Sequence, residues 1–95
     1  GIKADEPAID LPVACAIISS MLNRPIDKKV CAMGEVGLSG EIRSIGFLET
    51  RMREAQKMGF NRILLPFSTS GKIAGNPSLE LVFVKNVSEI ASKLF

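Results

Sequence analysis

The chain has 95 residues, 46% of them hydrophobic, with 12 lysines and arginines against 10 aspartates and glutamates and a formal net charge of +2. This length fits a single domain with its own core, and no apolar run approaches the roughly 20 residues of a membrane span, so we expect a soluble chain. The absence of histidine excludes Ser-His-Asp and Cys-His catalysis, and two cysteines alone do not make an ordinary zinc site.

The first helix is predicted over residues 11–22. Asp10 is the expected acidic N-cap, and apolar side chains follow helical spacing on two faces, which predicts a helix buried nearly all round with Ile18 at the centre of one face. Asn-Arg-Pro at 23–25 ends it, because proline cannot continue the helical hydrogen bonds. Before this helix, the start at Gly1 without a methionine and a strand-like Ile2 suggest a piece of a longer protein.

The two cysteines belong to apolar segments. Cys15 lies within the first helical pattern, and Cys31 lies in residues 30–33, which are predicted to form a buried strand. One disulfide is an alternative, but buried thiols in a reducing compartment fit these surroundings better. We therefore expect two free cysteines.

A glycine-rich hairpin is predicted in residues 34–46, which contain four of the eight glycines. Val36 and Ile42 flank Gly-Leu-Ser-Gly, so two short strands joined by a tight turn are expected, with Gly40 at positive φ. Periodicity alone favours a structural hairpin without chemistry.

A second helix follows at residues 47–58. Its core stripe is Leu48, Met52 and Ala55, and Gly59 is the expected residue after its C-cap. Residues 62–66 then form a core strand, giving a strand, helix and strand crossover. The outer face is charged, comprising Glu49, Arg51, Arg53, Glu54 and Lys57.

The last third has a polar segment between two further elements. Residues 67–77 are turn-rich, with at most one helical turn near 72–74, and residues 81–84 are a strand. Asn86 is the expected cap of the last helix, with Glu89 completing a capping box. The order of elements predicts an α/β fold, bordering on α+β, in which helices are layered on a sheet.

Two functional motifs are incomplete in this sequence. Ser-Thr-Ser-Gly-Lys at 68–72 lacks the first glycine and the final Ser or Thr of a phosphate-binding loop. A serine activated by lysine needs a desolvated lysine, and Lys57 falls on the outer helix face.

Four segments together resemble a known family. They are Asp-Glu-Pro-Ala-Ile-Asp at 5–10, the helix ending at 23–25, the hairpin at 34–43, and Glu-Ala-Gln-Lys-Met-Gly-Phe at 54–60. The chain resembles, over essentially all its length, the Lon-protease-like C-terminal domain of the bacterial DNA repair protein RadA, also called Sms. The resemblance implies the fold that Lon proteases share with a ribosomal-protein domain, and a single domain at 1–95 whose first strands would precede Gly1.

The resemblance also implies that the catalytic serine and lysine of Lon proteases are replaced. Aligned by this resemblance, the serine falls on Ala8, the last glycine of its loop on Asp10, and the lysine on Arg51. Alanine has no nucleophile, and a guanidinium with a pKa above about 12 is no general base. A pseudo-protease domain is therefore expected, with no cofactor of its own.

For function, the resemblance implies a non-catalytic module of a cytoplasmic recombination ATPase that assembles into a homo-oligomeric ring and contacts DNA, without a membrane partner. ATP, magnesium and zinc are implied for the parent chain only. The alternatives are a divergent Lon-type peptidase using another serine, such as Ser39 or Ser44, and a pure oligomerisation scaffold. The expected DNA-binding residues are Arg43, Arg51, Arg53 and Lys57.

Overall fold

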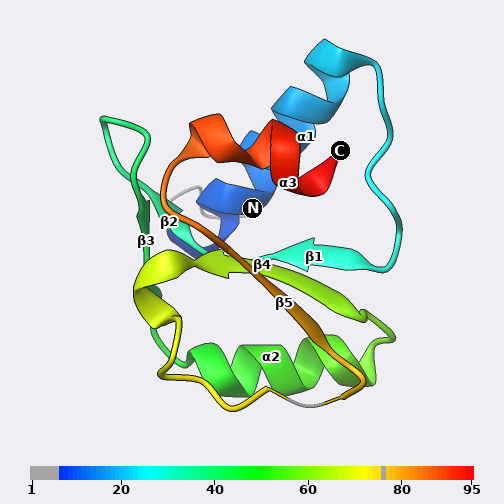
Figure 1. Ribbon diagram of the computed structural model, residues 1–95, viewed down its shortest axis with the longest axis vertical. Helices are drawn as coiled ribbons and strands as arrows, with labels where there is room; N and C mark the ends of the chain where they lie inside the picture. Colours follow the sequence, from blue (N-terminus) through cyan, green and yellow to red (C-terminus); the bar gives the residue numbers. More distant parts are fainter. Residues whose placement is uncertain (1–6, 76) are drawn as a thin grey trace, which may run out of the picture.

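A parallel three-stranded sheet lies between helices on its two faces, with a small hairpin at one side (Figure 1). The structure is a computed structural model that describes residues 7–75 and 77–95; the strand end expected at Ile2 lies outside them. The elements are η1 Pro7–Ile9, α1 Asp10–Leu22, β1 Val30–Ala32, β2 Glu35–Val36, β3 Ile42–Arg43, α2 Leu48–Lys57, β4 Arg62–Pro66, η2 Phe67–Thr69, β5 Glu80–Val84, η3 Val87–Glu89 and α3 Ile90–Leu94.

The sheet has the strand order β1-β4-β5, and β4 pairs in parallel with both neighbours. Ile63 is aligned with Cys31 on one side and with Leu81 on the other. The predicted crossover from β1 through α2 to β4 is confirmed, and so is the α/β class. Buried parallel strands are continuous apolar runs, as β4 is from Ile63 to Pro66.

Alternate side chains of β4 enter two separate cores, because successive residues of a strand face opposite sides. Leu64 joins the core beneath α1 and α3, where Leu11 and Ile90 are fully buried. Ile63 and Leu65 join the core above α2, with Met52. Figure 1 shows α1 and α3 on one face of the sheet and α2 on the other.

The predicted hairpin is confirmed, and it is tied to the segment after β5. β2 and β3 pair antiparallel, with Val36 opposite Ile42, and Gly40 has a φ of +82°. The amide of Ile42 donates to the carbonyl of Lys85 at 2.9 Å, and the amide of Val87 donates to the carbonyl of Gly40 at 2.9 Å. The hairpin therefore connects the middle of the chain to its last elements.

The first helix differs from its prediction in two ways. Asp10 is its first helical residue and not its N-cap, since Ile9 holds that position without a side-chain hydrogen bond. The helix is also not buried all round: Ile17 is 54% exposed and Met21 is 80% exposed. Ile18 packs against the core but is only half-buried. The sheet covers one helix face, and no described residue covers the opposite one.

Two local predictions in the last third also need correction. The helical turn occurs at Phe67–Thr69 rather than near 72–74, and there the Thr69 hydroxyl donates to the carbonyl of Pro66 at 2.6 Å. Asn86 does cap η3, accepting from the Ser88 amide at 3.0 Å. Glu89, however, reaches the amide of Lys85 at 3.4 Å, one residue before the position of a capping box.

Candidate functional site

The start of α1 is bound directly to the hairpin. Asp10 Oδ2 accepts a hydrogen bond from the amide of Val36 at 3.2 Å, and the Leu11 amide donates to the carbonyl of Gly34 at 3.0 Å. Gly34 is buried, and a Cβ there would lie about 3.1 Å from Ile42 and 3.2 Å from Leu11. The Asp10 carboxylate therefore connects the N-terminus of α1 to the hairpin.

The two positions compared with a protease dyad lie at the starts of two different helices. Ala8 is half-buried in η1, immediately before α1. Arg51 is in the first turns of α2, where its Nε donates to the carbonyl of Gly46 at 3.1 Å and its amide donates to the carbonyl of Phe47 at 3.0 Å. The Arg51 guanidinium thus helps to close the turn that opens α2.

The hairpin carries an ion-pair network around Arg43. Its guanidinium lies 2.9 Å from the carboxylate of Glu41 and 3.6 Å from that of Glu35. The hydrogen bond from Arg43 lowers the pKa of Glu41, and the same bond raises the pKa of Arg43. Glu41 also accepts from the Ser39 amide at 3.0 Å, so its carboxylate organises the turn.

The four basic residues expected to contact DNA, here called the basic surface, are Arg43, Arg51, Arg53 and Lys57. Among the described residues, Arg43 has the two glutamates of the hairpin as neighbours, and Lys57 lies 3.7 Å from Glu54. Arg53 donates to the Thr50 hydroxyl at 3.4 Å. Neighbouring glutamates therefore offset more of the positive charge of this surface than was expected from the sequence.

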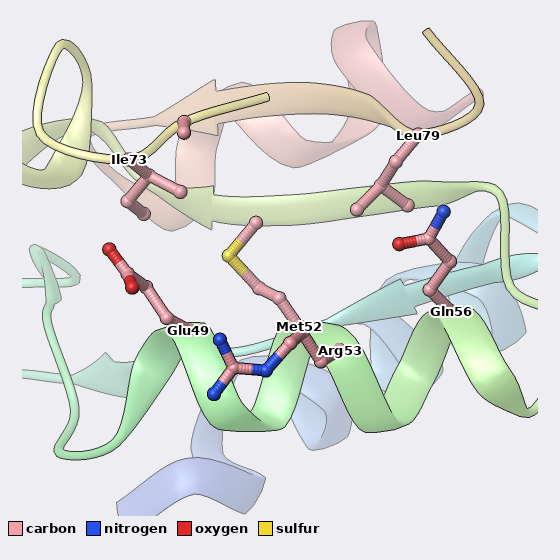
Figure 2. Close-up of a pocket in the computed structure, with 7 residues that line it drawn as sticks. Glu49, Met52, Arg53, Gln56, Ile73 and Leu79 are labelled. Atoms are coloured by element: carbon pink, nitrogen blue, oxygen red, sulfur yellow. The ribbon is translucent and has the colours of Figure 1, made fainter. Parts of the chain in front are cut away.

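Next to the basic surface is a cavity of about 230 Å³ between α2 and the segment leading to β5. Figure 2 shows Met52 rising from α2 between Ile73 and Leu79, with Glu49 and Arg53 at the helix side. The lining is thus apolar in its depth and charged at its rim. Arg53 belongs to both the cavity and the basic surface, a proximity that the sequence did not reveal.

Both cysteines line a second, mostly apolar cavity of about 240 Å³. They are free thiols, as expected, and burial raises the pKa of each to about 11. A thiol with this pKa is protonated at neutral pH and is a poor nucleophile. Within residues 7–75 and 77–95, no group of three or more Cys, Asp or Glu residues could hold a metal ion, and no helix is long and apolar enough to cross a membrane.

Phe47 is a feature that sequence reasoning missed. It was expected to be an ordinary first residue of the second helix, but it is the N-cap, with a left-handed φ of +58° and a side chain that is 82% exposed. Gly46 before it signals a turn, yet the left-handed position is taken by the phenylalanine. No pattern of apolar residues predicts this conformation.

The chain is similar to one family model and to several proteins named DNA repair protein RadA. A family model described as subunit ChlI of Mg-chelatase matches residues 1–69. The chain is 41% identical over 95 residues to the DNA repair protein RadA of Streptococcus pneumoniae (strain ATCC BAA-255 / R6), covering 100% of the chain and 23% of that relative. The RadA proteins of Listeria monocytogenes and Bacillus subtilis are each 40% identical, over 98% and 94% of the chain. The chain spans about a fifth of the length of these relatives.

Proposed function

From the premise that this chain belongs to the family described as subunit ChlI of Mg-chelatase, we propose that it serves as a non-catalytic module of a RadA-type DNA repair protein. The observation that carries the proposal is the 41% identity to a protein named DNA repair protein RadA along the whole chain. In the proposed function the module has a Lon-like fold, takes part in ring assembly and contacts DNA. Any ATP, magnesium or zinc chemistry would belong to other parts of the parent protein.

Three observations support a non-catalytic role. Ala8 offers no nucleophile, and Arg51 carries a guanidinium that helps to close the first turn of α2. Asp10 places a carboxylate at the N-terminus of α1, where an oxyanion would otherwise be stabilised, and that carboxylate is engaged by the Val36 amide. The thiols of the buried Cys15 and the half-buried Cys31, each with a pKa of about 11, are protonated at neutral pH.

DNA contact through the basic surface is supported by its position on one helix and the adjoining hairpin. Arg43 and Lys57 already have glutamate neighbours, so each module would bind phosphate weakly. Several modules in a ring would multiply such weak contacts by raising the effective concentration of each remaining site. Binding of this kind depends steeply on salt and reads little sequence, because phosphate contacts release counterions.

The test is a double charge reversal, Arg51→Glu with Arg53→Glu, in the full-length protein. We expect weaker DNA binding at low salt and a shallower dependence of affinity on salt, with assembly unchanged by light scattering. Lys28→Glu with Lys29→Glu is the matched control, because both lysines are exposed and the change in charge is equal. Arg53→Glu alone leaves the hydrogen bond from Arg51 to Gly46 intact, so a loss of DNA binding in this variant would come from the charge at position 53.

Equal loss of binding in the test and control variants would contradict a specific surface. Unchanged binding in the test variant would favour the second candidate, an oligomerisation scaffold without DNA contact. The uncovered face of α1 supports that candidate, because exposed apolar helix faces are typical of protein interfaces. A divergent peptidase based on Ser39 or Ser44 has less support. Both serines are exposed in the hairpin region, and the basic residue between them in the chain is Arg43 rather than a desolvated lysine.

A further inference from the structure

The backbone of Phe47 is strained, and its ring does not take part in the core. Its φ of +58° and ψ of +34° lie in the left-handed region, which a bulky side chain rarely adopts. Among the described residues, the other non-glycine with positive φ is Asn23, a residue type that tolerates it. Since the Phe47 side chain is 82% exposed, burial of the ring does not offset the strain. Strain of this kind concentrates at functional positions.

The surrounding turn holds the ring in this outward position. The Phe47 carbonyl accepts from the Arg51 amide at 3.0 Å, and the preceding carbonyl of Gly46 accepts from Arg51 Nε at 3.1 Å. Leu48, the next residue, packs into the core above α2. The chain thus anchors both sides of Phe47 and leaves its aromatic ring in solvent.

We propose that Phe47 stacks against an unpaired base of single-stranded nucleic acid. Arg51, whose Nε donates to the Gly46 carbonyl of the same turn, supplies a positive charge next to Phe47. An exposed aromatic ring next to a guanidinium fits a partner with a flat apolar face and a negatively charged backbone. The inference rests on the proposed DNA contact, and it adds that the contact prefers single strands over duplex.

The decisive experiment uses fluorescence, because the 95-residue chain contains no Trp or Tyr. In Phe47→Trp, the new indole should be quenched saturably by a thymidine 20-mer and much less by a duplex of the same length. Met21→Trp is the matched control: Met21 is 80% exposed on α1, which lies on the opposite face of the sheet from α2 (Figure 1), and its indole should not respond. Equal responses from the two variants would overturn the proposal.

Two further variants connect the strain with binding. Phe47→Ala should weaken single-strand affinity about 5- to 150-fold and leave duplex affinity nearly unchanged. Phe47→Gly should show the same loss while raising Tm by a few degrees, since glycine adopts positive φ without strain. If Phe47→Ala binds single strands like the wild type while the Arg51 and Arg53 double variant does not, stacking is wrong and DNA contact stands. If the wild type binds neither form of DNA, in the chain or in the full-length protein, both proposals fall.

Discussion

The carboxylate of Asp10 accepts a hydrogen bond from the backbone amide of Val36, with 3.2 Å between Oδ2 and N. The two residues lie 26 positions apart, one at the start of α1 and the other in β2. Together with the bond from the Leu11 amide to the Gly34 carbonyl, this contact fixes where the first helix meets the hairpin. The same carboxylate also lies in the first turn of α1, where the helix dipole favours a negative charge.

Replacing Asp10 should therefore cost stability. Asp10→Ala leaves the part-buried Val36 amide without its acceptor, and we expect the free energy of unfolding in urea to fall by about 1–3 kcal/mol. Asp10→Asn keeps an acceptor oxygen and should lose less. Asp27→Ala is the control, because Asp27 accepts from the Lys29 amide in an exposed loop, and it should lose the least. Equal losses for Asp10→Ala and Asp27→Ala would refute the role assigned to Asp10.

The module should not hydrolyse peptides, in the presence or absence of ATP. Ala8→Ser combined with Arg51→Lys should still give little turnover of a fluorogenic peptide, because Asp10 continues to place a bonded carboxylate at the helix N-terminus. Turnover by the unmodified protein that disappears on changing a single serine, such as Ser39 or Ser44, would show instead that the domain is a peptidase.

Three residues of α1 should differ in their sensitivity to truncation. Leu11 is fully buried, so Leu11→Ala should cost about 2–5 kcal/mol. Ile18 is only half-buried, and Ile18→Ala should cost about 1–2 kcal/mol, less than full burial would imply. Ile17 is exposed, and Ile17→Ala should stay within about 0.5 kcal/mol of the wild type. Chemical denaturation measures all three, and a large loss at Ile17 would mean that this face is covered in solution.

Stability should decrease at alkaline pH through the two thiols. Burial raises the pKa of Cys15 and Cys31 from 9.0 to about 11, so the folded chain holds these protons while the unfolded chain releases them. The contribution is complete below pH 9 and is lost as the pH rises through 11. Urea unfolding of the wild type and of Cys31→Ala between pH 7 and 10.5 measures it. The variant should show the smaller decrease, and parallel curves would disprove the assignment.

Local patterns were sufficient for much of the fold. The spacing of Met52 and Ala55 predicted the buried stripe of α2, and both are buried. The apolar run at 62–66 predicted β4 with its observed bounds, and the Gly-Leu-Ser-Gly turn predicted the positive φ of Gly40. Each of these features depends only on residues that are close together in the chain, so local sequence patterns are enough to predict it.

Features that depend on distant partners were not predictable in this way. Aspartate is a residue type favoured at an N-cap, but the carboxylate of Asp10 instead accepts a hydrogen bond from the amide of Val36. The apolar outer face of α1 was expected to be buried, but it is exposed. The spacing of apolar residues shows which faces of a helix are apolar, and it does not show which of those faces the rest of the chain covers. For the candidate site, the sequence led to the proposed basic residues, but it did not predict the ion pair from Arg43 across the hairpin to Glu35, nor the outward turn at Phe47.

The position of β4 at the centre of the sheet has a consequence for synthesis on the ribosome. Its residues Ile63, Leu64 and Leu65 are almost fully buried, yet β5, which covers one edge of β4, comes 14 residues after the end of β4. Ile90, the first residue of α3 and part of the core with Leu64, emerges later still. A nascent chain therefore exposes an apolar strand with an open edge until the residues up to Ile90 have been translated, which makes residues 62–66 a natural binding segment for chaperones during translation.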